Sequence, residues 1–313
     1  MFIVGIDIGG MSIKIGLVDN DGKILAKNRK VTAKTAEECI AGMIEQIDDL
    51  LAENNLTVKD LLGIGIGCPG LINSKDGIVI SNCNMGWDNV DIVNQIKKVY
   101  DLPVKLSNDA NVAALGEVVF GSAKNYEDAV MLTLGTGVGG GIVIGKKLYE
   151  GGNSLGAEMG HVTIVSGGEL CGCGRKGCLE AYASASALIR QTKEAMLADK
   201  DSSMWKFVNG DINAVDGRTA FECSKEGDKS ANIVVDNFVT YLSDGIMSIL
   251  NVFRPQAIII GGGVSAQGDY LVNKIIDYCK KYKYGYGGAP VSDIVTATLG
   301  NDAGIIGAAS LIV

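Results

Sequence analysis

Residues 2–18, FIVGIDIGGMSIKIGLV, decide how the chain begins to fold. Apolar and mostly β-branched residues lie on both sides of the pair Gly9-Gly10, which predicts strands at residues 2–8 and 13–18 joined by a tight glycine turn. An Asp-Gly turn then leads into a third predicted strand at residues 23–28. The first three elements are therefore expected to form an antiparallel meander.

The same order of strand, glycine turn and strand returns in residues 129–144, AVMLTLGTGVGGGIVI. Here we predict a strand at 129–134, a glycine turn over 135–141 and a strand at 142–144. Such a repeat predicts an α/β fold of two similar halves with a cleft between them, each giving a Gly-rich turn to one ligand. A third Gly-rich loop, Gly261-Gly262-Gly263, follows a predicted strand at 257–260.

The glycine turn after residue 134 superficially matches a dinucleotide-binding fingerprint. That fingerprint must open a helix, whereas the β-branched residues that follow this turn predict a strand. We therefore favour a hairpin turn that holds phosphate, with the Thr136 hydroxyl as an added donor, over an ordinary turn. The Gly9-Gly10 pair suits a phosphate for the same reason, and Asp7 just before it could orient a Mg²⁺ shell, although such pairs are also common in plain turns.

Composition narrows the possible functions. The 313 residues include 43 glycines and only 4 prolines, so the glycines do not belong to a disordered Pro/Gly-rich linker. A net charge of −8 opposes binding to nucleic-acid phosphates, and the least charged stretch, residues 130–145, is too short and too Gly-rich to cross a membrane. The first residues are typical of a buried strand and not of a signal peptide. We expect a soluble cytoplasmic protein whose eight cysteines favour metal binding over disulfides.

The rest of the chain alternates between predicted helices and strands, as in an α/β fold. A capping box formed by Thr35 and Glu38 predicts a helix after residue 35. Short buried strands are expected at 63–67 and 104–106, long helices near 231–253 and 269–283, and a last apolar segment, 303–313, that folds back onto the first half. We place the first lobe at residues 1–118 plus a helix at about 299–313, and the second lobe, with a zinc-binding loop, at 119–298.

The zinc prediction comes from residues 161–180, which contain the sole histidine of the chain. Three thiolates and one imidazole make a closed tetrahedral Zn²⁺ set, and the glycines between the cysteines let neighbouring sulfur atoms turn inward. The alternative is a core histidine among buried cysteines. The predicted ligands are His161, Cys171, Cys173 and Cys178.

Asn108 and Asp109 follow a predicted strand and open a predicted helix. A carboxylate there can accept a hydroxyl proton in phosphoryl transfer while the neighbouring amide holds the same sugar or alcohol. Taken alone, Asp109 also fits the role of an N-cap. Glu158 and Glu180 flank the predicted zinc loop, so that loop is expected to bring both carboxylates near one place.

Taken together, these motifs resemble the ROK family of sugar kinases and sugar-responsive repressors, within the actin-like ATPase superfamily. The resemblance covers essentially the whole chain, and the order and spacing of the motifs carry it more than any single motif does. The motifs are Asp7-x-Gly-Gly, Cys68-Pro-Gly70, Asn84-Met-Gly-Trp87, Asn108-Asp109, Leu134-Gly-Thr-Gly-Val-Gly-Gly-Gly141, Glu158-Met-Gly-His161, the Cys-x-Cys-Gly-x-x-Gly-Cys-x-Glu run ending at Glu180, and Gly261-Gly-Gly263.

The resemblance implies a two-lobed, actin-like (ribonuclease H-like) enzyme that closes on ATP and a hexose, and that assembles as a homodimer or homotetramer. It implies that Asp109 deprotonates the sugar 6-hydroxyl and that structural zinc fixes His161, with Mg²⁺ and ATP as cofactors. The sugar-binding residues it implies are Gly70, Asn84, Asn108, Asp109, Glu158, His161 and Glu180. Those implied for ATP and its Mg²⁺ are Asp7, Gly9, Gly10, Ser12, Gly135, Thr136, Gly137, Gly262 and Gly263.

One position departs from the family pattern, which usually has threonine after the glycine pair. Met11 stands there and has no hydrogen to donate to a phosphate. Ser12 is the nearest hydroxyl, but its side chain is expected on the opposite face of the strand.

Two classes of function compete. The first is an ATP-dependent sugar kinase, with glucose as the leading substrate and N-acetylmannosamine, fructose or allose as alternatives. Polyphosphate or ADP are alternative phosphate donors. The second is a non-catalytic sugar sensor or repressor. Such repressors carry a helix-turn-helix before the first strand, whereas here strand residues begin at Phe2, and the chain is acidic. These observations and Asp109 favour the enzyme.

Overall fold

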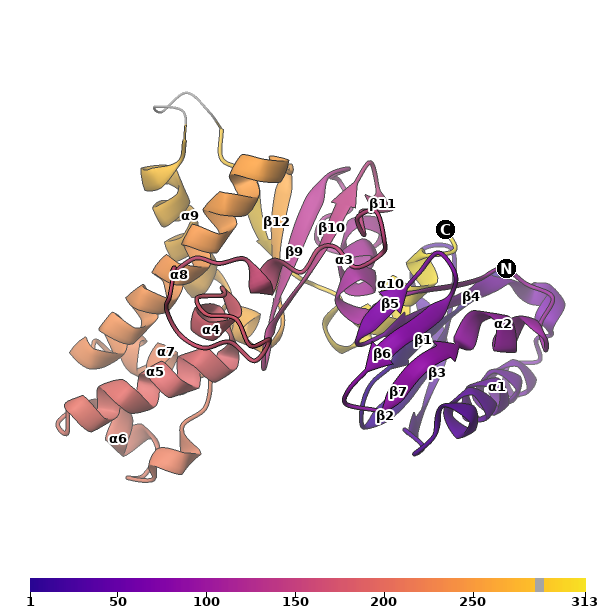
Figure 1. Ribbon diagram of the computed structural model, residues 1–313, viewed down its shortest axis with the longest axis horizontal. Helices are drawn as coiled ribbons and strands as arrows, with labels where there is room; N and C mark the ends of the chain where they lie inside the picture. Colours follow the sequence, from indigo (N-terminus) through magenta and orange to yellow (C-terminus); the bar gives the residue numbers. More distant parts are fainter. Residues whose placement is uncertain (285–289) are drawn as a thin grey trace. The chain divides into compact units, whose positions relative to one another are not determined.

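The computed structural model describes residues 1–284 and 290–313, which form two units (Figure 1). Unit 1 contains Met1–Ala129, Gly141–Ala157 and Thr298–Val313, and unit 2 contains Val130–Gly140 and Glu158–Ala297. Unit 1 includes residues 141–157 because that segment packs against its other elements. A Cβ on Gly141 would lie 2.5 Å from the Cβ of Ala114, for example.

Unit 1 is built on a five-stranded sheet in the order β3-β2-β1-β4-β8. β1 pairs antiparallel with β2 and parallel with β4, while β2 and β3 are antiparallel and β4 and β8 parallel. The predicted three-stranded meander is therefore confirmed. The strands are β1 (Phe2–Ile8), β2 (Ser12–Val18), β3 (Ile24–Val31), β4 (Leu61–Cys68) and β8 (Val104–Asn108).

A second five-stranded sheet has the order β11-β10-β9-β12-β13, which matches the first sheet strand for strand. The repeat inferred from the two glycine turns is thus confirmed in the topology. The second turn is shorter than predicted, because Val138-Gly139-Gly140-Gly141 already belongs to β10. The strands are β9 (Ala129–Leu134), β10 (Val138–Ile144), β11 (Lys147–Leu148), β12 (Ala257–Gly261) and β13 (Asp293–Thr296).

Close packing explains why two positions of β10 are glycine. These glycines are the reason that the sequence predicted a longer turn. A Cβ on Gly140 would press on the side chain of Met159, and one on Gly141 would press on Ala114. Both partners are distant in sequence, so local composition alone could not separate strand from turn. A small third sheet, absent from the sequence prediction, consists of β5 (Leu71–Asn73), β6 (Ile78–Asn82) and β7 (Trp87–Asp91).

The two faces of the first sheet are covered by different helices, because side chains alternate along a strand. Val4 and Ile6 of β1 point into a core with the apolar face of α1 (Ala36–Glu53), which begins at the predicted Thr35 capping box. Ile3, on the opposite face, packs with Ile305 of α10 (Ala303–Ser310). Figure 1 shows α10 beside α3 (Asp109–Val119), and α1 beside α2 (Ile92–Lys97).

Helix α10 lies so close to the first sheet that two strand positions must be glycine. A Cβ on Gly5 would overlap the carbonyl oxygen of Ile305, and a Cβ on Gly65 would overlap that of Ala308. Both obstacles are main-chain atoms, which cannot rotate away. The predicted return of the C-terminal segment to the first half is therefore present as a close main-chain contact.

This contact predicts that Gly65→Ala destabilises the protein by about 2–3 kcal/mol, because the added methyl forces α10 away from the sheet. The measurement is the free energy of unfolding from urea titration. Gly42→Ala, in α1, is the matched control, because a Cβ there meets no atom within 4 Å. That substitution should stabilise the helix by about 0.5–1 kcal/mol. Equal stability of Gly65→Ala and the unmodified protein would contradict the packing argument.

A buried carboxylate ties α3 to the segment before α10. Glu117 is fully buried and accepts hydrogen bonds from the N–H groups of Ser122, Thr298 and Leu299, each at 2.8 Å, and from the Ser122 hydroxyl at 3.0 Å. These donors satisfy a charge that would otherwise be costly to bury. Glu117 thereby fixes the chain at Thr298, where it re-enters unit 1.

The helices of unit 2 gather around α8, whose apolar side contacts α5, α7 and α9 (Figure 1). α8 is long and apolar enough to cross a membrane by length and composition, but 56% of its apolar window is buried, as in the core helix of a soluble protein. The helices are α4 (Glu180–Ala183), α5 (Ala185–Ala198), α6 (Ser203–Phe207), α7 (Thr219–Lys225), α8 (Lys229–Phe253) and α9 (Asp269–Tyr282). The 3₁₀ turns are η1 (Val58–Asp60), η2 (Met159–His161), η3 (Ile212–Ala214), η4 (Gly263–Gln267) and η5 (Gly300–Asp302).

Candidate functional site

At the junction between β8 and α3, the residue that caps the helix and the candidate catalytic carboxylate are different residues, which the sequence did not distinguish. Asn108 is the N-cap, and its side-chain oxygen accepts hydrogen bonds from the N–H groups of Ala110 (2.9 Å) and Asn111 (3.4 Å). Asp109 is the first helical residue, so the interpretation of Asp109 as the N-cap is wrong. Its carboxylate accepts a bond from Ala110 at 2.9 Å and remains exposed. The positive end of the helix dipole lies beside it and favours its charged form.

The amide of Asn108 also contacts a corner formed by Pro69 and Gly70. Its nitrogen donates to the Gly70 carbonyl at 3.2 Å, while the Asn82 nitrogen donates to the Pro69 carbonyl at 2.9 Å. Gly70 has a φ of +105°, and a Cβ there would overlap the carbonyl oxygen of Ser81. The corner therefore requires glycine for both backbone conformation and space.

Asn84 is carried by the exposed turn between β6 and β7, and Asn82 holds that turn. The buried Asn82 side chain accepts hydrogen bonds from the N–H groups of Asn84 (3.1 Å) and Met85 (3.2 Å). Because Asn82 and Asn108 bind the two neighbouring carbonyls of one corner, the structure brings Gly70, Asn84 and Asn108 together. Sequence reasoning missed Asn82, whose one signal is an amide at the end of an apolar strand.

The carboxylate of Asp7 lies at the end of β1, beside the first glycine turn. Lys14 of β2 forms an ion pair with it, with Nζ 2.9 Å from Oδ2. A Cβ on Gly304 would collide with this carboxylate, so α10 begins directly against it. In the turn itself, the Gly9 N–H donates to the Ser12 carbonyl at 3.0 Å, and Met11 is 83% exposed.

The second glycine turn is closed by Gly135, whose N–H donates to the Gly137 carbonyl at 3.0 Å. A Cβ on Gly262 would lie 2.5 Å from the nitrogen of Leu134, so the Gly262-Gly263 loop packs against the base of this turn. The two Gly-rich loops of unit 2 are thus side by side. A cavity of about 330 Å³ next to them is lined by Thr136, Leu170, Cys171, Gly172, Glu180, Ala181, Ser184, Ser186, Ala187 and Arg190.

Glu180, the first residue of α4, links the second glycine turn to the cysteine-rich loop. Its Oε2 accepts a hydrogen bond from the Val138 N–H at 3.0 Å, and a Cβ on Gly137 would overlap this oxygen. Its Oε1 accepts from the Cys171 thiol at 3.3 Å. The Glu180 carboxylate therefore holds both the second glycine turn, which the sequence assigned to the ATP phosphates, and the cysteine-rich loop, which it assigned to zinc.

The predicted zinc ligands gather in one cluster within unit 2. The ligand atoms of His161, Cys171, Cys173 and Cys178 all lie within 4.8 Å of one another. The Cys173 and Cys178 sulfur atoms are 3.7 Å apart, and Nδ1 of His161 is 3.6 Å from the Cys171 sulfur. A tetrahedral ion with metal–sulfur bonds of about 2.3 Å separates its sulfur ligands by about 3.8 Å. The donor set and spacing therefore fit a structural Zn²⁺.

The thiols of this cluster differ in acidity according to their surroundings. Burial raises the pKa of Cys171 to about 12 and also raises that of Cys178. The main-chain N–H of Arg175 lowers the pKa of the exposed Cys173. Metal binding requires thiolates, so a zinc ion would have to displace the protons of two buried thiols. We expect zinc affinity to rise with pH for this reason.

Glu158 and His161 bracket η2, which rests on β10. The N–H of His161 donates to the Glu158 carbonyl at 3.0 Å, and a Cβ on Gly160 would overlap the carbonyl oxygen of Val138. Glu158 is exposed, and the Nδ1 face of His161 is the one turned to the cysteines. The predicted residues thus fall into two groups. Unit 1 carries Asp7, Gly9, Gly10, Ser12, Gly70, Asn84, Asn108 and Asp109, and unit 2 carries the others.

Two α/β units, each built around strand, glycine turn and strand, are the two-domain fold of actin-like ATPases. The sequence pattern of the ROK family matches residues 3–313, and the chain belongs to that family.

Named relatives within the family include both enzymes and regulators. The chain is 37% identical to the glucokinase of Thermotoga maritima, over 99% of this chain and 96% of that one. It is 32% identical to the xylose repressor of Bacillus subtilis, over 100% of this chain and 77% of the repressor. The solved ROK glucokinase of Streptomyces griseus, in complex with glucose and AMPPNP, has a TM-score of 0.80 and 33% identity, with 99% of each chain covered.

Proposed function

We propose that this protein transfers the terminal phosphate of ATP to the 6-hydroxyl of a hexose, with glucose as the acceptor, in the cytoplasm. The observation that carries the proposal is the β8–α3 junction, where Asn108 caps the helix and Asp109 places an exposed carboxylate at its first position. Similarity to proteins named glucokinase, one of them solved with glucose and AMPPNP, supports the choice of sugar and donor.

Asp109 is the general base of this proposal. Its carboxylate takes the proton of the sugar 6-hydroxyl as the oxygen forms its bond to the terminal phosphorus of ATP. The bond from that phosphorus to the ADP oxygen breaks, and ADP leaves with its electron pair. The proton then passes from Asp109 to solvent. Asp109 is the first residue of α3, at the positive end of the helix dipole.

We assign hydroxyl-binding groups for the sugar in each unit separately. In unit 1 these are Gly70, Asn84 and Asn108, which the Pro69-Gly70 corner brings together. In unit 2 they are Glu158, His161 and Glu180. The cluster of His161 and the three cysteines would hold Zn²⁺, which supplies a fixed cross-link to a loop with little regular structure. That cross-link orients the His161 ring and the segment ending at Glu180.

The glycine turns take the ATP phosphates in this proposal. A Cβ on Gly10 or Gly135 would meet no atom within 4 Å, so packing does not explain why these positions are glycine. Close approach of a ligand to the main chain does explain it. Gly9, Gly137, Ser12 and Thr136 complete the phosphate contacts, Gly262 and Gly263 face the adenosine, and the Asp7 carboxylate orients the Mg²⁺ shell.

Met11 predicts a measurable weakness in ATP binding. Replacing Met11 with threonine adds a hydroxyl at an exposed turn position, and one hydrogen bond to a charged phosphate should lower the KM for ATP by about threefold to tenfold. Val252→Thr is the matched control, because Val252 is 74% exposed on α8 and lies outside the proposed site. An unchanged or raised KM for ATP in Met11→Thr would reject the missing phosphate contact.

The activity is tested by following ADP release with Mg-ATP against glucose, mannose, fructose, allose, N-acetylglucosamine and N-acetylmannosamine. We expect turnover with glucose to exceed that with the other sugars. If another sugar is turned over fastest, glucose is not the substrate, but the proposed kinase activity is supported. Polyphosphate and ADP are tested as donors in the same panel.

The second candidate function is a sugar-binding regulator without catalysis, which the similarity to the xylose repressor favours. It predicts that sugars bind, as measured by calorimetry, while no donor and sugar pair yields product. We also propose that the protein assembles as a homodimer or homotetramer, which light scattering measures directly.

A further inference from the structure

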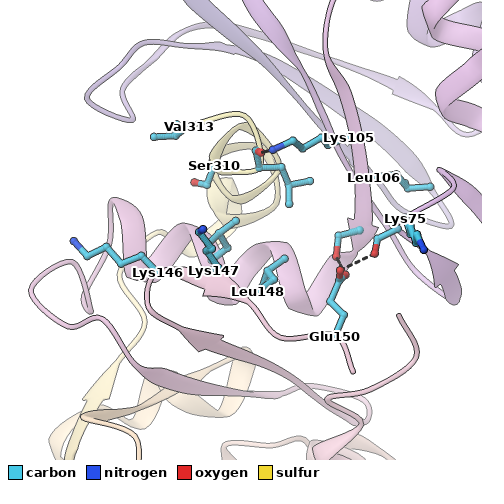
Figure 2. Close-up of a pocket in the computed structure, with 13 residues that line it drawn as sticks. Lys75, Lys105, Leu106, Lys146, Lys147, Leu148, Glu150, Ser310 and Val313 are labelled. Atoms are coloured by element: carbon cyan, nitrogen blue, oxygen red, sulfur yellow. Dashed lines mark hydrogen bonds between the residues drawn. The ribbon is translucent and has the colours of Figure 1, made fainter. Parts of the chain in front are cut away.

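A basic cavity lies in unit 1, away from the residues described above. Its volume is about 350 Å³, and it is formed by the end of α10, the edge strand β8 and the segment around β11 (Figure 2). Lysines dominate its charged side chains. The charged and hydroxyl side chains in its wall are Ser74, Lys75, Lys105, Ser107, Lys146, Lys147, Glu150 and Ser310.

The lysines of this cavity are unusual on a chain with a net charge of −8. The wall has four lysines and one carboxylate side chain, Glu150, so its side chains carry a net charge of +3. Lys105 donates to the Leu311 carbonyl at 2.6 Å. Among the described residues, Lys75 and Lys147 take part in no ion pair. Figure 2 shows Lys147 directed toward Ser310, and Lys146 directed away from Glu150.

A neighbouring cavity extends the positive surface. It has a volume of about 620 Å³, shares Ser74, Lys75 and Lys105 with the first, and adds Lys97 and Asp76. Lysines that surround a hollow without carboxylate partners attract an anion, and an ammonium group binds phosphate as a point charge. The charge therefore points to a ligand with at least one phosphate.

The centre of the cavity favours a ligand that also has hydroxyl groups. Glu150 accepts hydrogen bonds from Ser107 (2.5 Å) through Oε1 and from Ser74 (2.6 Å) through Oε2, as Figure 2 shows. A carboxylate has about four lone-pair positions, so about two remain for donors from a ligand. Hydroxyls supply such donors, whereas inorganic phosphates would be repelled by the Glu150 charge.

We propose that this cavity binds a sugar phosphate. The sugar hydroxyls bond to Glu150, which the two serines hold in place, and the phosphate lies beside Lys147, which is directed toward Ser310. The site stands on β8, whose last residue is Asn108, and Ser107 is part of both the strand and the cavity wall. It is separate from the proposed ATP and sugar contacts, and it does not depend on whether the chain is a kinase or a regulator.

The test is calorimetric titration of the whole protein with glucose 6-phosphate, in the presence of saturating glucose so that the catalytic sugar site is filled. We expect Lys147→Gln to raise the Kd by about tenfold, because it removes one charged contact to phosphate, and Lys75→Gln to raise it by about threefold, because it removes a positive charge from the wall of the cavity. Both side chains are exposed, so neither change disturbs the core. Lys59→Gln, another exposed lysine of unit 1 outside both cavities, is the matched control and should leave the Kd within about twofold.

Glu150→Gln and inorganic pyrophosphate separate sugar-phosphate recognition from simple attraction of anions. Glu150→Gln should raise the Kd for glucose 6-phosphate, because the amide offers fewer acceptor positions to hydroxyls, and lower the Kd for pyrophosphate, because the repelling charge is removed. Pyrophosphate should bind more weakly than glucose 6-phosphate to the unmodified protein.

The proposal is overturned if glucose 6-phosphate does not bind, if both lysine variants bind it as the unmodified protein does, or if pyrophosphate binds as tightly. Because the readout is binding, each of these results leaves the proposed phosphoryl transfer untouched.

Discussion

Asp109→Asn should lower kcat by about 100-fold or more while leaving the affinity for sugar nearly unchanged, because an amide cannot accept the hydroxyl proton. The structure indicates that this substitution removes the base without disturbing the start of α3. The cap of α3 is Asn108, and the bond that Asp109 accepts from the Ala110 N–H can be kept by an asparagine oxygen. The helix start should therefore survive, and the loss in rate should report the missing base.

The measurement compares kcat with the Kd for glucose from calorimetry in the same variant. Asp91→Asn is the matched control, because Asp91 caps α2 through a bond from the Asn94 N–H at 3.1 Å and lies outside the proposed site. It should retain the full kcat. If Asp109→Asn turns over within a few-fold of the unmodified protein, Asp109 is not the base.

Cys171→Ser should remove most bound zinc and raise the KM for sugar by about 10- to 100-fold, with a lower melting temperature. The loop of residues 161–180 contains one short 3₁₀ turn and two isolated bridges, so the cluster supplies much of its order. His161 belongs to the cluster, and Glu180 accepts a hydrogen bond from Cys171. Loss of the metal should therefore displace His161 and Glu180, two of the side chains proposed to contact the sugar.

Zinc content is measured by mass spectrometry alongside KM and melting temperature. Cys279→Ser is the matched control, because it places a hydroxyl at another buried thiol of unit 2, far from the cluster in sequence. It should lower stability modestly and leave zinc and KM unchanged. Chelation of the unmodified protein should reproduce the effect of Cys171→Ser. Fully active protein that contains no zinc would exclude a role for the metal.

Local patterns predicted the parts of the fold that local chemistry decides. A glycine turn between β-branched runs is sufficient to specify a hairpin, so the meander and its repeat at residues 129–144 could be read from sequence and appear as two sheets of matching order. The spacing of His161, Cys171, Cys173 and Cys178 likewise identified a cluster whose atoms do converge.

Contacts between distant residues account for what the sequence did not predict. Asn108 and Asp109 are adjacent and both suit a helix start, so only the backbone register reveals which one is the cap. Gly140 and Gly141 are glycines because Met159 and Ala114 press on them, not because the chain turns. The side chains of Asn82 and Glu117 form their hydrogen bonds in the protein interior, and no local sequence pattern indicates these roles.

The close packing of α10 against Gly5 and Gly65 has a consequence for folding during synthesis. β1 leaves the ribosome before the helix that covers it, which lies about 300 residues later in the chain, after all of unit 2. During that interval Ile3 lacks its cover from Ile305. Nascent chains therefore carry an uncovered apolar sheet face until α10 has been synthesised, which makes them targets for chaperones.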